Sequence, residues 1–204
     1  MKDLKVAVIY YSSTGTNYQL ARWAEEAASQ TAEVRFRKVK ELAPPEAMEG
    51  NKDWKNHLEK TQDVREVALE DLEWADVFVF SAPTRYGNMP AQLKQFLDTT
   101  GGLWFKGKLA DKVVTAMTSA SNPHGGQEGT LLALYKTMFH WGAIVAAPGY
   151  TDESFFEAGG NPYGLSVTAG KDSLDDKVKT AVTRQVERAV RIASAIKGAR
   201  GADR

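Results

Sequence analysis

Hydroxyl side chains and one glycine cluster directly after the first apolar run, residues 6–11, and before a helical pattern. They are Ser12, Ser13, Thr14, Gly15, Thr16 and Asn17. Such a turn at a helix N-terminus offers hydroxyls and unpaired backbone N–H groups, which together bind phosphate. It lacks the lysine of a P-loop and the spacing G-x-G-x-x-G, so neither an NTPase nor a dinucleotide site is predicted. A phosphate held without a cationic side chain indicates a tightly bound monophosphate cofactor; alternatively, these residues only cap the helix.

A second polar cluster follows the apolar residues 77–80. It comprises Pro83, Thr84, Arg85, Tyr86, Gly87 and Asn88. Because these residues follow a central strand, we expect them beside the first cluster, at the edge where open parallel sheets bind ligands. The ring of Tyr86 suits stacking on a flat ligand, and Gly87 allows the backbone to approach that ligand closely. We favour this interpretation over an ordinary turn, since a turn does not need an Arg-Tyr-Gly-Asn sequence.

A third, glycine-rich loop follows the apolar residues 113–118. Its candidate binding residues are Ser119, Ala120, Ser121, Asn122, Gly125 and Gly126. Main-chain groups of such a loop suit the polar edge of a ring. The loop is a weak signal alone, but three loops at one sheet edge together predict a single ligand-binding crevice.

Short apolar runs alternate with helical periodicities, which is typical of repeated βα units and a parallel sheet. We predict strands near residues 6–11, 33–39, 77–80, 113–118 and 143–147. We predict helices near residues 17–29, 92–98 and 129–140, and a last helix over the apolar repeat from 178 to 196. Ser173 and Asp176 form its capping signal. The expected fold class is α/β, a doubly wound five-stranded parallel sheet with helices on both faces.

Two segments exceed a minimal five-strand unit. Residues 44–67 are polar and are expected to carry a short helix, and residues 148–171 are expected to form an ordered excursion. Such excursions are usually functional or interfacial. The 204-residue chain is expected to form a single domain over residues 1–198, with a frayed tail at 199–204.

Composition excludes several classes of function. The chain has no cysteine, which excludes disulfides, thiolate catalysis and iron–sulfur clusters. Its 26 basic and 26 acidic side chains leave no net charge, which argues against nucleic-acid or anionic-membrane binding as the main task. No apolar stretch approaches the roughly 20 residues that span a bilayer, and no signal-peptide pattern opens the chain, so we expect a cytoplasmic protein.

Three segments resemble one family of enzymes. SSTGTN, PTRYGNMPAQLKQFLDTTGGLW and HGGQE, in this order and at these strand ends, resemble the WrbA-type NAD(P)H:quinone oxidoreductases of the flavodoxin-like superfamily. The resemblance covers nearly the whole chain. It implies a sheet of order 2-1-3-4-5, FMN as cofactor, NADH or NADPH as co-substrate, a small-molecule quinone as substrate and a homotetramer.

The resemblance also implies roles for single residues. The loop at 12–17 would bind the FMN phosphate, that at 83–88 the isoalloxazine ring, and that at 119–126 its ribityl and pyrimidine side. Trp104 matches an aromatic residue that lies over the flavin face where substrate enters. Thr14 stands where many relatives place an aromatic residue close to the nicotinamide.

One departure concerns a contact between subunits. Relatives have His-His-Gly where this chain has His140, Trp141 and Gly142. In the relatives the second histidine contacts the flavin of a neighbouring subunit. Here His140 substitutes for it, Trp141 stacks instead, or the contact is absent.

The implied reaction is a ping-pong reduction of quinones. NAD(P)H delivers hydride to flavin N5 and leaves before the quinone takes two electrons at the same face, with no catalytic side chain assigned. Two alternatives remain: a flavodoxin-type electron carrier, and another FMN reductase acting on azo or nitro compounds. Electron carriers of that type tend to be strongly acidic, whereas this chain is neutral.

Overall fold

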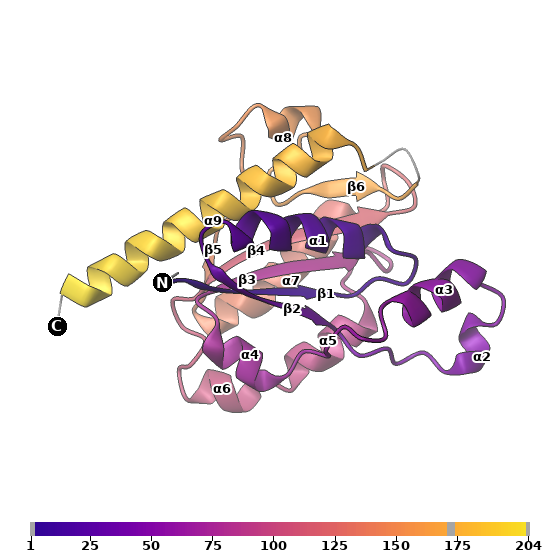
Figure 1. Cartoon of the computed structure of the whole chain (residues 1–204), viewed down its shortest axis with the longest axis horizontal. Helices are drawn as coiled ribbons and strands as arrows, with labels where there is room; N and C mark the ends of the chain where they lie inside the picture. The colour runs from indigo at the N-terminus through magenta and orange to yellow at the C-terminus, as the bar shows by residue number, and fades with distance from the viewer. Residues whose placement is uncertain (1–2, 171–173, 203–204) are drawn as a thin grey trace.

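The computed structural model describes residues 3–170 and 174–202. A parallel sheet runs through the molecule, with helices on both faces (Figure 1). The strands are β1 (Lys5–Tyr10), β2 (Glu33–Lys38), β3 (Val77–Pro83), β4 (Val113–Ala120), β5 (Ile144–Val145) and β6 (Ser166–Thr168). The helices are α1 (Thr16–Ser29), α2 (Pro45–Met48), α3 (Lys52–Lys60), α4 (Leu69–Trp74), α5 (Ala91–Asp98), α6 (Gly101–Phe105), α7 (Gln127–Trp141), α8 (Ser154–Glu157) and α9 (Asp176–Ala202).

The strand order is β2-β1-β3-β4-β5, as predicted. The pairing is parallel throughout this order; Val8 of β1, for example, lies opposite Phe36 of β2 on one side and Val79 of β3 on the other. Every residue of β3 and β4 is buried. Strands covered on both faces need almost continuous apolar sequence, which explains these runs and confirms the predicted doubly wound class.

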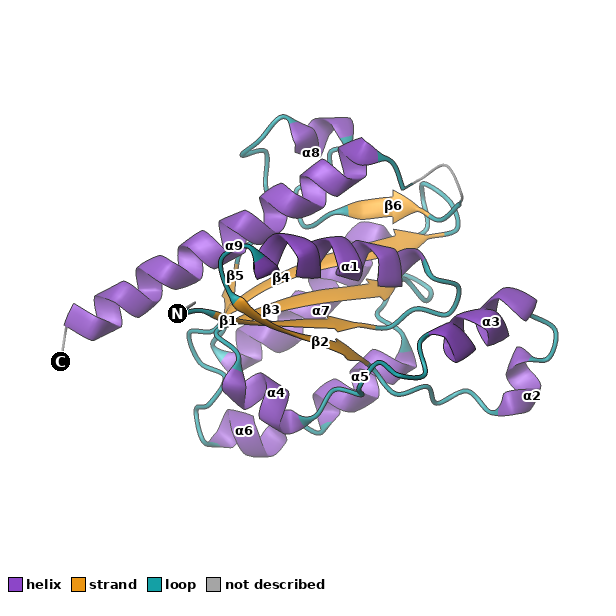
Figure 2. Ribbon diagram, in the orientation of Figure 1, coloured by secondary structure: helices purple, strands orange, loops and turns teal. Residues whose placement is uncertain are grey.

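Successive residues of the central strands contribute to two hydrophobic cores. Val6 and Val8 pack on the side of α1 and α9, whereas Ala7 and Ile9 pack on the side of α4, α5 and α7. In Figure 2, α1 and α9 lie above the sheet and α4 and α5 lie below it. Because both faces are packed, the carboxyl ends of β1, β3 and β4 form a rigid edge.

The fifth strand is split in two, which the sequence analysis did not predict. β5 pairs with the start of β4, where Ile144 lies opposite Val113. β6 pairs with the end of the same strand, where Ser166 lies opposite Thr118. The predicted strand over 143–147 was therefore too long.

An excursion with α8 separates β5 from β6 (Figure 1). It begins near Pro148, which has no N–H to extend the ladder. The chain re-enters the sheet layer at Gly164, where a Cβ atom would lie 2.3 Å from the carbonyl oxygen of Ala116. A side chain at position 164 would therefore prevent β6 from completing the edge beside β4.

The other excursion and the last helix also differ in detail from the prediction. Residues 44–67 contain two helices, α2 and α3, where one was expected. The tail expected to fray continues α9 as far as Ala202. Ser173 lies outside the described residues; among the described ones, Asp175 caps the helix, since its Oδ1 accepts a hydrogen bond of 2.9 Å from the N–H of Val178. Within the described ranges, no helix combines the length and apolar character needed to cross a membrane.

Candidate functional site

The carboxyl ends of β1, β3, β4 and β6 surround a cavity of about 230 Å³. Its lining residues are Ser12, Ser13, Thr14, Thr16, Asn17, Pro83, Thr84, Arg85, Ser119, Ala120, Ser121 and Ala169. All of these except Ala169 belong to the three predicted loops. Ala169 follows β6, and its N–H donates a hydrogen bond of 2.6 Å to the carbonyl of Ala120. The sequence analysis missed it because the split of the fifth strand has no local signal.

The first loop presents backbone N–H groups at the start of α1. Gly15 is the N-cap residue, with φ of 104° and no side-chain cap on the helix. Its own N–H donates to Ser12 Oγ at 3.0 Å, which closes the loop. The first N–H groups of a helix have no intrahelical acceptor, so those at Thr16 and Asn17 remain suited to an anion.

Asn17 has a different part in this loop from the one expected. It is 1% exposed. Its Nδ2 donates to Ser119 Oγ at 2.6 Å, and Ser81 Oγ lies within donating distance of both its side-chain Oδ1, at 3.2 Å, and its backbone carbonyl oxygen, at 2.9 Å. The side chain of Asn17 therefore fixes the start of α1 to the ends of β3 and β4. For a phosphate, Asn17 has only its backbone N–H to offer.

The second loop is a two-residue hairpin turn. Arg85 and Asn88 exchange backbone hydrogen bonds of 2.7 and 3.0 Å. Between them Tyr86 has φ of 52° and Gly87 has φ of 76°, the left-handed pair that this turn requires. A left-handed conformation costs a non-glycine residue about 1 kcal/mol. The strained turn holds the Tyr86 ring fully exposed, and such strain is typical of ligand-binding sites.

Two glycines bring the second and third loops into backbone contact. A Cβ on Gly126 would lie 2.7 Å from the Cα of Gly87. The hydroxyl of Thr84 joins the same loops, because it accepts from the Gly87 N–H at 3.2 Å and donates to the Gly125 carbonyl at 3.3 Å. Thr130 on α7 adds a hydrogen bond of 2.7 Å to this hydroxyl. The two loops are therefore positioned as one unit.

Arg85 brings a positive charge to the cavity. Its Nη2 donates to Ser13 Oγ at 3.3 Å, so the guanidinium lies over the first loop. The cavity therefore contains a cationic side chain beside the first loop, which the first loop alone did not suggest. The sequence analysis missed the contact because positions 13 and 85 are joined only by the pairing of β1 with β3. Within residues 3–170 and 174–202, no cluster of His, Asp and Glu side chains is arranged to hold a metal ion.

Two further predicted residues lie away from the cavity, on α6 and at the end of α7; Figure 1 shows α6 at the opposite end of the sheet from the tips of β3 and β4. Trp104 on α6 is 52% exposed. His140 is exposed near the end of α7. That end lies against the start of β4, since the Asp111 N–H donates to the Gly142 carbonyl. A single chain therefore does not bring these side chains to the cavity.

Trp141 is part of the hydrophobic core. It is 5% exposed and contacts Phe78 edge to face, with the ring centroids 6.1 Å apart. Its ring has no free face for stacking on a cofactor of another subunit. Trp141 lies on the core side of α7 and packs against the sheet. Its burial contradicts the interpretation that Trp141 stacks on the cofactor of another subunit.

The residues around the cavity suit FMN in their chemistry. Unpaired N–H groups, hydroxyls and one guanidinium match a phosphate, and an exposed tyrosine beside a glycine–glycine contact matches a flat ring. A parallel sheet of this order with such a loop after its first strand defines a flavodoxin-like FMN-binding protein. The family described as NADPH-dependent FMN reductase matches residues 4–155, and the chain belongs to this family.

Two curated relatives share a printed name. A protein of Deinococcus radiodurans called NAD(P)H dehydrogenase (quinone) is 49% identical over 196 residues, covering 96% of this chain and 98% of the relative. One of Aromatoleum aromaticum with the same name is 39% identical, covering 83% of this chain and 84% of the relative.

Solved structures share the fold at lower identity. A WrbA-like flavodoxin from Agrobacterium tumefaciens is 20% identical with a TM-score of 0.64, covering 96% of this chain and 99% of that one. A flavodoxin from Bacillus cereus is 14% identical with a TM-score of 0.60, covering 92% and 97%. These two similarities establish the flavodoxin-like fold.

Proposed function

We propose that this chain is an NAD(P)H:quinone oxidoreductase that uses FMN to reduce quinones to hydroquinones by two electrons. The observation that carries the proposal is the convergence of three loops on one cavity: a phosphate-binding turn, an exposed aromatic on a strained turn, and a glycine-rich wall. The names of the relatives agree with it. FMN, when bound, supplies the redox chemistry, and the protein supplies binding and orientation.

Each loop has a proposed part in holding the cofactor. Residues 12–17 bind the phosphate through their hydroxyls and the N–H groups of Thr16 and Asn17, together with the guanidinium of Arg85. Residues 83–88 hold the isoalloxazine ring, with Tyr86 as a stacking surface, and residues 119–126 bind the ribityl and pyrimidine side. Thr14, at the mouth of the cavity, lies close to the nicotinamide. The two substrates use one face in turn, which predicts ping-pong kinetics.

Completion of the site by a second subunit is part of the proposal. Trp104 and His140 are exposed at the edge of the sheet away from the cavity. They reach a flavin only if subunits associate, and a homotetramer provides such contacts. Phe105 and Phe139, which are 84% and 61% exposed, flank these residues and suit burial between subunits. We further propose one FMN-binding domain over residues 1–198 and a cytoplasmic location, where reduced nicotinamide nucleotide is available.

A visible absorption spectrum tests the proposal. The purified protein is supplemented with FMN, desalted and scanned. A retained flavin spectrum that bleaches with NAD(P)H and returns on adding benzoquinone is the expected result. Retained flavin that does not bleach would favour an electron carrier, and protein that retains no flavin would refute the cofactor assignment.

A further inference from the structure

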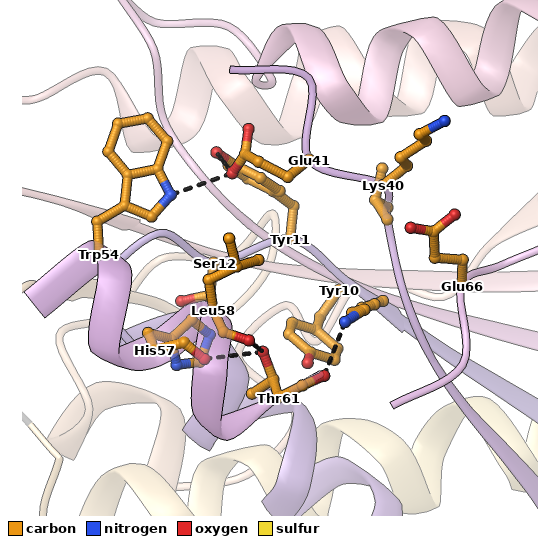
Figure 3. A pocket seen from close by; sticks show the side chains of 12 residues that line it. Tyr10, Tyr11, Ser12, Lys40, Glu41, Trp54, His57, Leu58, Thr61 and Glu66 are labelled. Carbon is orange, nitrogen blue, oxygen red and sulfur yellow. Dashed lines mark hydrogen bonds between the residues drawn. The ribbon is translucent and has the colours of Figure 1, made fainter. Parts of the chain in front are cut away.

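The segment between β2 and α4 folds over the sheet edge beside the first loop. A second cavity of about 120 Å³ lies beneath it, and Ser12 lines this cavity as well as the first (Figure 3). α3, the longest helix of the segment, has no buried residue. Apolar packing of α3 therefore contributes little to holding the segment in place.

The carboxylate of Glu41 accepts hydrogen bonds from three separate parts of the chain. Oε2 accepts from Tyr11 Oη at 2.9 Å and Trp54 Nε1 at 3.1 Å. Oε1 accepts from Gln92 Nε2 at 2.7 Å. Two backbone N–H groups, at Leu42 and Ala43, also donate to Oε1, each at 2.9 Å. Figure 3 shows Glu41 between Tyr11 and Trp54.

These hydrogen bonds keep the group ionised. Burial by itself raises the pKa of the Glu41 carboxyl, but the donors from Ala43, Gln92, Tyr11 and Trp54 outweigh burial and lower the pKa below its usual value. The pKa of the Tyr11 phenol is raised, by burial first and then by the charge of Glu41. Tyr11 therefore stays protonated and remains a donor to the carboxylate.

The donors adjoin the loops of the cofactor site. Tyr11 directly precedes Ser12, the first residue of the phosphate-binding loop. Gln92 is the second residue of α5, four positions after Asn88 at the end of the second loop, and its Nε2 also donates to Tyr11 Oη at 2.9 Å. On α3, His57 faces the first loop, since a Cβ on Gly15 would lie 3.7 Å from its Nδ1. One carboxylate thus connects the residue before the first loop, the start of the helix after the second loop, and the overlying helix α3.

We propose that Glu41 is a positioning residue of the FMN site, which sets the spacing of the phosphate-binding loop and the ring-binding loop by joining Tyr11, Gln92 and Trp54. The inference rests on the proposed function for the identity of the ligand. Glu41 does not line the first cavity. It acts through the backbone at Tyr11–Ser12 and through the start of α5.

The primary test is Glu41→Gln. A glutamine amide has one oxygen and one NH2 group, so the NH2 group would replace one of the two carboxylate oxygens that accept hydrogen bonds. If it replaces Oε2, Tyr11 and Trp54 face a donor in place of an acceptor. Tyr11 can turn its hydroxyl to accept, but Trp54 has only a donor and loses its partner. We expect the dissociation constant for FMN, measured on apo-protein by quenching of FMN fluorescence, to rise about tenfold. Glu49→Gln, on an exposed position of the same segment, is the matched control and leaves the constant unchanged.

Two readouts without cofactor separate positioning from general stability. Amide hydrogen exchange of residues 12–17 and 83–88 is expected to accelerate in Glu41→Gln, while exchange in β3 and β4 keeps its wild-type rate. Ultraviolet titration is expected to show one tyrosine ionising at a lower pH than in the wild type. This ionisation should be absent from the double variant of Glu41→Gln with Tyr11→Phe, which identifies the tyrosine as Tyr11.

The outcomes decide the proposal. A folded Glu41→Gln variant with wild-type FMN affinity and wild-type exchange in both loops would overturn it. If Glu41→Gln does not fold, the variant Trp54→Phe is used, because it removes one donor to Glu41. The proposal then requires faster amide exchange at residues 12–17 in Trp54→Phe than in the wild type. A wild-type protein that binds no FMN would refute the proposed function, yet exchange and titration would still test the role of Glu41.

Discussion

Gly126 offers a sharp test of how the second and third loops form one unit. Its φ is 84°, in the left-handed region, and a Cβ would lie 2.7 Å from the Cα and 3.2 Å from the nitrogen of Gly87. Ordinary van der Waals contact begins near 3.4 Å. The Gly126→Ala substitution therefore requires the loops to separate by at least about 0.7 Å, the difference between the 3.4 and 2.7 Å distances.

The expected loss of stability has two parts. Left-handed backbone costs an alanine about 1 kcal/mol. Forcing an extra methyl group into packed structure costs about 1–3 kcal/mol. Gly126→Ala should therefore lower the free energy of unfolding by about 2–4 kcal/mol, and the displacement should weaken FMN binding about tenfold or more.

Urea unfolding and FMN titration measure these effects. Gly160→Ala is the control for backbone strain, since Gly160 has φ of 72° and no atom within 4 Å of an added Cβ. It should lose only about 1 kcal/mol and bind FMN normally. Gly102→Ala, without positive φ or close neighbours, is the control for the substitution itself. If Gly126→Ala matches Gly160→Ala in both measurements, the backbone contact does not position the loops.

Three further outcomes are expected. Tyr86→Ala removes an exposed ring without altering the core, so FMN retention under dialysis should fall while the urea midpoint changes little; full retention would contradict the stacking role. Asp71→Asn breaks a buried ion pair with Arg37 (3.0 Å) and should lower the free energy of unfolding by about 3 kcal/mol at neutral pH. Burial raises the pKa of Asp71, but hydrogen bonds from Arg37, the backbone of Ala68 and Arg35 outweigh burial and lower it. As pH falls, the Asp71 carboxylate is therefore protonated in the unfolded state before it is protonated in the folded state. The stabilisation by ionised Asp71 is then present above pH 3.8 and is lost as pH falls further. Urea titrations at several pH values should show this loss in the wild type and not in Asp71→Asn. If the proposed homotetramer forms, Trp104→Ala should weaken subunit association in sedimentation experiments, with His140→Ala as a parallel variant; a monomeric wild-type protein would contradict the proposed homotetramer.

The pattern of the sequence predicted the parallel sheet, and the family resemblance implied its strand order. Apolar runs such as that of β3 identify strands buried on both faces, and alternation with helical periodicity leaves few arrangements other than a parallel sheet. Each predicted loop follows such a run directly. Parallel strands end at a common edge, so local patterns were sufficient to group residues 12–17, 83–88 and 119–126.

Contacts between distant segments were decided by the tertiary structure. Arg85 reaches Ser13, and Asn17 is held by Ser119, because strand pairing brings these positions together. Neither contact has a signature in the spacing of residues. The five donors around Glu41 were missed for the same reason, since three of them come from the residue after β1, from α3 and from α5.

The faces of helices and the path of the last strand also depended on the whole fold. The sequence left open whether Trp141 stacks on a cofactor of another subunit, and the orientation of α7 against β3 buries it on Phe78. The fifth strand is split because Gly164 permits a close approach to Ala116, which brings Ala169 to the cavity. Periodicity reports which residues are apolar and in what repeat. Only packing against the rest of the chain determines which neighbour each of them meets.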